Sequence, residues 1–168
     1  MPYKIGVLMG GLSEEREVSF SSGASIIKAC EENGYKAVKI EFTGQYKDLL
    51  TDVKSVDMVF NALHGGAGED GQVQSWLKKN NIKFTGSGEL ASKICMNKDR
   101  SKTIAKILGM KTPHWEVFNE KYPKPKLKLP YVIKPNEQGS TVGLSLVENK
   151  NTVEEALGLA FTYSNNIL

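Results

Sequence analysis

Apolar strands that run directly into glycine-rich loops leave this sequence few folds to adopt. Residues Lys4–Met9 form an apolar run that ends at Gly10-Gly11, and Asp57–Leu63 ends at a loop from His64 to Gly71. Such runs are typical of parallel strands that are buried on both faces. In an open α/β sheet, ligands bind at the loops that follow the carboxyl ends of the strands. The first half of the chain therefore predicts an open parallel sheet with a ligand site at these loops.

The rest of this half continues the alternation of strands and helices. Helices are expected over Arg16–Glu32, Gln72–Lys79 and Glu89–Leu108, and further strands over Ala37–Phe42 and Ile82–Thr85. We place this N-terminal α/β domain at residues 1–96. Because the loops after the first and third strands both lie at carboxyl ends, we expect Glu15 and His64 to meet at one rim of the sheet.

A second domain is expected over residues 97–168. It contains a connector at about 119–129, of which residues 121–128 are basic and contain two prolines. Strands are expected at Tyr131–Lys134 and Leu144–Glu148, a helix over Thr152–Tyr163, and the beginning of another strand at Ile167-Leu168. Two strands and one helix do not easily bury their own faces, so the sequence predicts an incomplete domain.

The loop between these two strands has the chemistry of a phosphate site. A short apolar strand delivers Lys134, and Ser140 and Thr141 follow between Gly139 and Gly143. Lysine supplies a point charge, glycines let backbone N–H groups approach oxygens, and the hydroxyls add donors. The lysine precedes the glycines, so this is not a Walker A loop. A plain β-hairpin with glycines in its turn is the alternative that the loop alone leaves open.

Composition excludes several classes of function. The net charge of +3 is small and dispersed, which does not indicate a nucleic-acid-binding protein. No apolar run is long enough to span a membrane, and no signal peptide is evident. Cys30 and Cys95 have no CxxC partner and fall in helical patterns. We expect both to be buried, reduced thiols of a cytoplasmic protein.

Four segments occur in an order that resembles a known family. They are Gly10–Ser19, Ala62–Gly71, Thr85–Lys102 and the loop at residues 134–143, which we call the lysine loop. Together they resemble the D-alanine–D-alanine ligases of the ATP-grasp family, and the resemblance extends from Ile5 to the last residue. It implies an N-terminal preATP-grasp, Rossmann-like sheet followed by an incomplete ATP-grasp central domain.

The resemblance implies a carbon–nitrogen ligase that makes D-alanyl-D-alanine for peptidoglycan. In the mechanism that the resemblance implies, ATP phosphorylates the carboxylate of one D-alanine and leaves as ADP, and the amine of a second D-alanine attacks the acyl phosphate, giving dipeptide and phosphate. D-alanine and ATP are then the partners, Mg²⁺ or Mn²⁺ is the metal cofactor, and the enzyme is expected to be a cytoplasmic homodimer. No nucleic acid or membrane partner is expected.

The family pattern also implies catalytic and substrate-binding residues. By resemblance, Glu15 binds the ammonium group of the first D-alanine, and His64 lies near its carboxylate. Ser140 hydrogen-bonds to Glu15 and links the phosphate loop to the substrate site. Glu14 and Glu17 match no such position and are expected to complement the helix dipole.

The ATP contacts implied by the resemblance lie in the second domain. Lys98 and Lys134 match two lysines that bind the ATP phosphates from opposite sides, where they offset charge that opposes attack by a carboxylate. Further contacts are implied at Gly139, Ser140, Thr141 and Val142. Three residues match no functional position and are expected to be packing or surface residues: His114, Trp76 and Trp115.

The chain departs from the family pattern in its length, which is about half that of the family. The part that would supply the metal ligands is missing, and no acidic pair near Leu168 replaces them. The 168-residue chain alone is therefore expected to be inactive. The alternatives that the sequence leaves open are another ATP-grasp carboxylate–amine ligase, a D-alanine–D-lactate ligase, and a non-catalytic nucleotide- or amino-acid-binding remnant.

Overall fold

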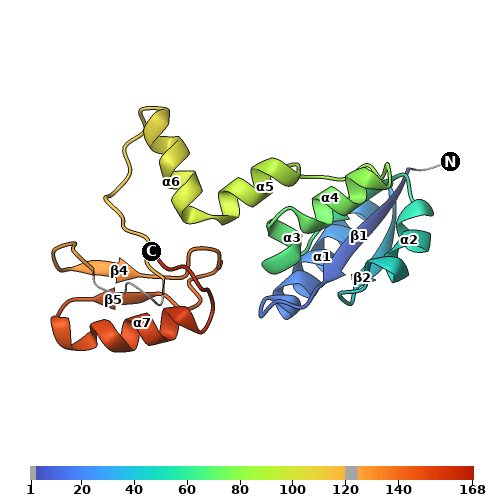
Figure 1. Cartoon of the computed structure of the whole chain (residues 1–168). Helices are drawn as coiled ribbons and strands as arrows, with labels where there is room; N and C mark the ends of the chain where they lie inside the picture. Colours follow the sequence, from blue (N-terminus) through green and yellow to red (C-terminus); the bar gives the residue numbers. More distant parts are fainter. Residues whose placement is uncertain (1–2, 120–124) are drawn as a thin grey trace. The chain divides into compact units, whose positions relative to one another are not determined.

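The computed structural model describes residues 3–119 and 125–168, which form two compact units, Met1–Lys93 and Ile94–Leu168. Part of the predicted connector, residues 120–124, lies outside the described residues. Within the described ranges, no helix has the length and apolar character to cross a membrane. Figure 1 shows the elements in chain order.

The first unit is built on a parallel sheet of three strands in the order β2-β1-β3. Its strands are β1 (Lys4–Gly10), β2 (Lys36–Phe42) and β3 (Met58–Asn61). Its helices are α1 (Arg16–Glu32), α2 (Tyr46–Lys54), α3 (Gly66–Glu69), α4 (Gln72–Lys79) and the first part of α5 (Glu89–Met96). The predicted open parallel α/β sheet is confirmed.

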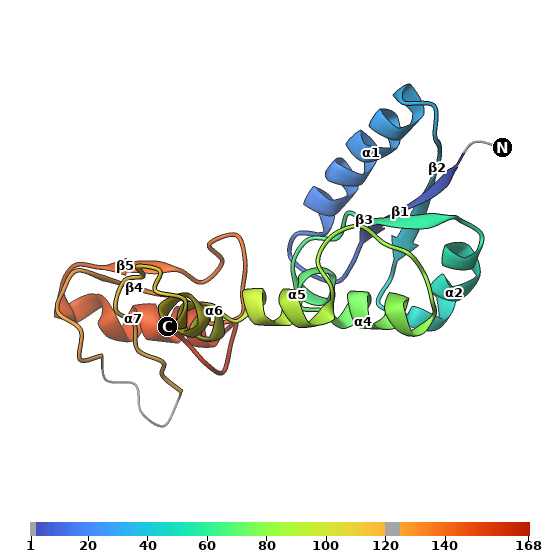
Figure 2. The same ribbon diagram turned by 90° about the horizontal axis from the view of Figure 1, so that it is seen from above.

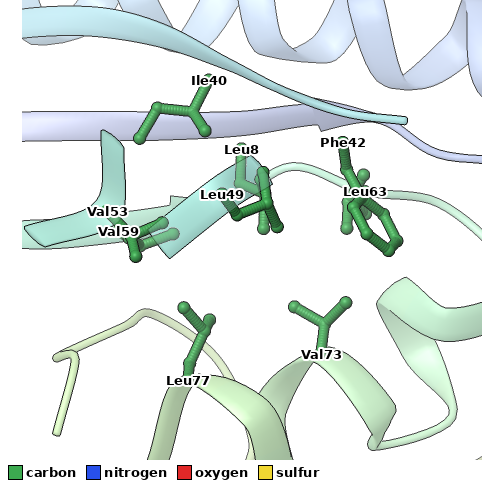
Figure 3. Packing of buried hydrophobic residues seen from close by; sticks show 9 residues of the cluster. All are labelled: Leu8, Ile40, Phe42, Leu49, Val53, Val59, Leu63, Val73 and Leu77. Carbon is green, nitrogen blue, oxygen red and sulfur yellow. The ribbon is translucent and has the colours of Figure 1, made fainter. Parts of the chain in front are cut away.

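Alternation along β1 divides the core between the two faces of this sheet. Leu8 faces a cluster completed by residues of α2 and α4, and Figure 3 shows Val73 and Leu77 of α4 pointing toward the strands. Val7 and Met9 face the other side, where Cys30 of α1 belongs to the same cluster. In Figure 2, α1 lies on one side of the sheet and α2 and α4 on the other. Helices on both faces leave the carboxyl ends of the strands accessible.

Several predicted elements of the first unit need correction. The third strand ends at Asn61, two residues early, and α2 and α3 were not expected. The strand predicted at Ile82–Thr85 is reduced to one parallel bridge between Val59 and Phe84. Cys30 is buried as predicted, but Cys95 is exposed. Its helix, α5, has no buried residue, so a helical pattern alone did not place Cys95 in a core.

The single helix predicted over Glu89–Leu108 is two helices. The first, α5, ends at Met96, and α6 spans Lys98–Ile107. Asn97 lies between them with extended backbone angles, and its side chain accepts a hydrogen bond from the backbone N–H of Arg100 at 2.9 Å. An asparagine in that position satisfies an otherwise unpaired donor of the first turn, which favours a new helix start over a continuous helix.

The second unit contains an antiparallel hairpin covered by one helix. It comprises α6, β4 (Tyr131–Ile133), β5 (Ser145–Val147), the short 3₁₀ turn η1 (Lys150–Thr152) and α7 (Val153–Phe161). The hairpin and the final helix are confirmed. Ile167 makes antiparallel bridges with both Phe118 and Pro135 and is fully buried, so the strand expected to begin there is present as these bridges.

Candidate functional site

A buried hydroxyl joins α1 to the ends of two strands. Gly10 and Gly11 both have positive φ, which glycine adopts without steric cost, and they turn the chain out of β1. The Ser19 hydroxyl accepts the Gly10 N–H at 2.9 Å and donates to the Ala62 carbonyl at 2.7 Å. Ser19 is fully buried with both roles satisfied. The loops that follow β1 and β3 are therefore held to the same helix.

Glu15 and His64 meet at this rim, as predicted from the sequence. The Ser13 hydroxyl donates to the His64 carbonyl at 2.6 Å and accepts the Glu15 N–H at 3.3 Å. A Cβ atom placed on Gly65 would lie only 2.7 Å from Glu15 Oε2, so the carboxylate lies directly against this glycine. A half-buried carboxylate and a half-buried imidazole thus lie on neighbouring loops.

The His64 ring is held from α1. Its Nε2 lies 3.0 Å from the Ser22 hydroxyl, within hydrogen-bond distance. The backbone contact through Ser13 and the ring contact through Ser22 come from different places on the chain. Sequence reasoning did not single out Ser22, although it lies three residues after Ser19 and therefore on the same face of the helix.

Arg16 makes a second set of contacts that hold the loop carrying Glu15. Its guanidinium donates to the Gly11 carbonyl at 2.8 Å and pairs with Glu41 of β2 at 2.7 Å. Hydrogen bonds from Lys39 and from Arg16 lower the pKa of the Glu41 carboxyl. Arg16 and Lys39 also lie over the ring of Phe20, at 4.9 and 4.6 Å from its centroid. The loop that carries the Glu15 side chain is therefore held by contacts from both Ser13 and Arg16.

In the second unit, Lys98 is turned toward the lysine loop. Its Nζ donates to the Gln138 carbonyl at 2.6 Å and to the Asn136 carbonyl at 3.2 Å. Burial, and then the nearby positive charge of Lys134, lower the pKa of Lys98, while Glu137 acts in the opposite direction. The two lysines predicted to share one site are therefore close enough to repel each other.

The loop after β4 has an unusual backbone. Ser140 and Thr141 both have positive φ, at 47° and 61°, which non-glycine residues adopt at a cost. The Val142 N–H donates to the Gly139 carbonyl at 3.0 Å, so it would have to leave this bond to donate to a phosphate. Backbone strain of this kind concentrates at ligand-binding segments, which favours a ligand loop over a plain hairpin turn.

Asn136 is a site residue that sequence reasoning missed. It is 3% exposed, and its Oδ1 accepts the Asp99 N–H at 3.0 Å. Its carbonyl accepts both the backbone N–H and the Nζ of Lys98, and its own N–H donates to the Asn166 carbonyl. The Lys134-Pro-Asn136 order after a strand was the only available signal. Asn136 joins the start of α6 to the lysine loop.

Replacing Asn136 with Ala is expected to lower the free energy of unfolding by about 1–3 kcal/mol, because the Asp99 N–H is left without its partner. Chemical denaturation of the 168-residue chain measures this effect. Asn149→Ala is the matched control, since the Asn149 side chain accepts a backbone N–H from Asn151 at an exposed turn. Equal effects of the two substitutions would contradict the structural role of Asn136.

A cavity of about 500 Å³ opens beside the lysine loop, inside the second unit. Its lining includes Lys102, Lys134, Trp115 and Tyr131. Lys102 lies 5.1 Å from the centre of the Trp115 ring and donates to the Thr112 hydroxyl at 2.7 Å. Burial and then the charge of Lys134 lower the pKa of Lys102. A cavity with an aromatic wall and two cations suits a ligand with a planar part and an anionic part.

The residues expected to have no functional role lie in two different settings. Trp76 packs against the main core of the first unit, as expected. His114 and Trp115 instead line the cavity, and the Trp115 indole N–H donates to Asp99 at 2.8 Å. Across residues 3–119 and 125–168, no group of three or more His, Cys, Asp or Glu side chains is placed to hold a metal ion.

The first unit is thus a parallel α/β unit with a carboxylate and an imidazole at one rim, and the second is a hairpin unit in which Lys98 and Lys134 lie close together. Two family models match the chain: D-ala D-ala ligase N-terminus over residues 41–87, and D-ala D-ala ligase C-terminus over residues 104–168. The chain belongs to the D-alanine–D-alanine ligase family.

Curated relatives support this assignment over nearly the whole chain. D-alanine–D-alanine ligase A of Clostridium perfringens (strain 13 / Type A) is 41% identical over 98% of this chain. The D-alanine–D-alanine ligase of Clostridium botulinum (strain Hall) is also 41% identical over 98% of this chain. This chain spans 56% of the length of either relative.

Solved structures agree with the sequence comparison. A crystal structure of D-alanine–D-alanine ligase from Bacillus anthracis matches with a TM-score of 0.89 and 36% identity, over 98% of this chain and 56% of that one. A second structure of the Bacillus anthracis enzyme, complexed with ATP, matches with a TM-score of 0.86 and 34% identity, over 98% of this chain and 57% of that one.

Proposed function

We propose that this chain is the N-terminal part of an enzyme that joins two D-alanines into D-alanyl-D-alanine at the expense of ATP. The observation that carries the proposal is the meeting of Glu15 with the His64-Gly65 segment at one rim. It occurs in a chain whose curated relatives are D-alanine–D-alanine ligases. A carboxylate and an imidazole on adjacent loops suit the two charged ends of an amino acid.

The proposed roles at the rim follow from charge. Glu15 accepts hydrogen bonds from the ammonium group of the first D-alanine, and His64 donates to its carboxylate. In the whole enzyme Ser140 hydrogen-bonds to Glu15. These three residues act as the catalytic and substrate-binding groups that this chain contributes.

The proposed ATP site uses the second unit. Lys98 and Lys134 bind the phosphates, with Gly139, Ser140, Thr141 and Val142 contributing donors. Burial, and then repulsion by Lys134, lower the pKa of Lys98, and an anion bound between the two lysines would relieve this repulsion. Mg²⁺ or Mn²⁺ would offset the negative charge of the phosphates, and its ligands would lie in the remainder of the enzyme.

In our proposal, residues outside this chain determine which second substrate the enzyme uses. A crystal structure of the VanG D-Ala:D-Ser ligase from Enterococcus faecalis matches with a TM-score of 0.81 and 26% identity, over 99% of this chain. Ligases with different second substrates thus share the fold of this half, and a D-lactate-using ligase remains an alternative. We propose D-alanine as the second substrate, and a cytoplasmic homodimer acting in peptidoglycan synthesis.

A hybrid protein tests the proposed function. Residues 1–168 joined to the C-terminal remainder of the Clostridium perfringens ligase are expected to make D-alanyl-D-alanine with ATP and Mg²⁺, since the hybrid restores the missing part of the fold. The 168-residue chain alone is expected to release no phosphate from ATP when D-alanine is added. Product detection by mass spectrometry and phosphate release measure both.

The intact Clostridium perfringens ligase and its C-terminal remainder alone are the controls for this experiment. An inactive hybrid beside an active intact relative would count against the proposed ligase and favour a non-catalytic remnant. Dipeptide synthesis by the 168-residue chain alone would show that the site is more complete than we propose.

A further inference from the structure

Two hydroxyls on one face of α1 contact the segment that carries His64. Ser19 donates to the Ala62 carbonyl, and Ser22, three residues later, contacts the His64 ring at Nε2. The Ser13 hydroxyl donates to the His64 backbone carbonyl at 2.6 Å. The backbone of His64 is therefore fixed independently of Ser22, and the orientation and protonation of the ring are what Ser22 can control.

The direction of the Ser22 hydrogen bond follows from its neighbours. A serine inside a helix commonly donates to the carbonyl four residues earlier, as Ser25 does to Ser21 at 3.1 Å. Over the described part of the chain, the Ser22 hydroxyl has one hydrogen-bond partner, the His64 imidazole. Its proton is therefore available to Nε2. A neutral imidazole that accepts at Nε2 carries its own proton at Nδ1.

We propose that Ser22 is a positioning residue that donates to Nε2 of His64 and so keeps Nδ1–H directed to the carboxylate of the first amino-acid substrate. The identity of that substrate rests on the proposed function, whereas the tautomer does not. Loss of the hydroxyl leaves the imidazole free to exchange tautomers and rotate, so a donor faces the substrate for only part of the time.

Nitrogen-15 NMR of the 168-residue chain tests the tautomer directly. Nitrogen shifts distinguish Nδ1–H from Nε2–H, and His114 is the only other histidine in the sequence, so it serves as an internal reference. The unsubstituted chain is expected to show Nδ1–H at His64, and Ser22→Ala is expected to shift the population toward Nε2–H. Ser22→Thr retains the hydroxyl and is expected to preserve Nδ1–H.

Ser25→Ala is the matched control, because this exposed serine on the same helix bonds only to its own helix backbone. Its His64 spectrum should equal that of the unsubstituted chain. An Nε2–H tautomer in the unsubstituted chain, or a Ser22→Ala spectrum identical to it, would overturn the proposal.

Kinetics of the hybrid ligase test the consequence for binding. Ser22→Ala is expected to raise the KM of the first D-alanine about tenfold, as the partial loss of one charge-assisted hydrogen bond would. The KM of ATP should not change, and Ser22→Thr should restore the KM of D-alanine. A changed tautomer with an unchanged KM would refute the positioning role. An inactive hybrid would instead refute the proposed function, while the NMR comparison would still decide the tautomer.

Discussion

Replacing Lys134 with Ala in the hybrid ligase is expected to cost about 2–4 kcal/mol of transition-state stabilisation, the scale of losing one preorganised donor. The rate should fall roughly 30- to 1,000-fold. Lys134→Arg is expected to rescue poorly, because a planar guanidinium does not occupy the position of a compact ammonium group. Steady-state kinetics with varied ATP measure both variants.

Lys150→Ala is the matched control, since Lys150 is exposed at the start of η1 and has no proposed role. A second readout concerns the neighbouring lysines. The charge of Lys134 lowers the pKa of Lys98 and of Lys102, so Lys134→Ala should raise both values, which NMR of the lysine side chains can follow. Unchanged kinetics would show that Lys134 has no role in the proposed ATP site, even if these pKa values rise.

Replacing Gly65 with Ala is expected to weaken binding of the first D-alanine strongly. Gly65 has φ 63° and ψ 177°, a conformation that is essentially confined to glycine and costs other residues about 1–3 kcal/mol. The added methyl group would also lie 2.7 Å from Glu15 Oε2. Either the backbone or the carboxylate must move. We expect the KM of D-alanine in the hybrid to rise at least about 100-fold, the effect of displacing a charged partner.

Gly66→Ala separates backbone strain from displacement of Glu15. Gly66 also has positive φ, at 44°, but a Cβ there would meet only Ser13, at 3.8 Å. This variant should lose stability in thermal denaturation yet bind D-alanine more tightly than Gly65→Ala does. Equal loss of binding in the two variants would show that strain alone, and not the contact with Glu15, explains the effect.

The sequence predicted those elements whose formation depends on the residues within the element itself. The strand at Lys4–Gly10 has an apolar run, the helix at Gln72–Lys79 has a clear apolar face, and the meeting of Glu15 with His64 follows from strand direction alone. The helix at Tyr46–Lys54 was missed, although its Leu49 and Val53 are buried and its Tyr46 packs against the same core.

Features that depend on distant partners could not be predicted. Asn136 looks like an ordinary turn residue, and its importance arises from Asp99 and Lys98, nearly forty positions earlier. Ser22 looks like one of several serines on a polar helix until the loop carrying His64 is folded against it. The periodicity of apolar residues shows which face of a helix or strand is buried. It does not show which side chain of another element packs against that face.

After α7, the segment Asn166–Leu168 returns to pair with the residues around Lys134. Leu168 exchanges two backbone hydrogen bonds with Lys134, at 2.8 and 2.9 Å, and Ile167 exchanges two with Phe118. Side chains along an extended segment point alternately to opposite faces, so a shift of this pairing by one residue would turn Ile167 out of the core. The backbone of Lys134 is thus held in place by a residue more than thirty positions downstream of it.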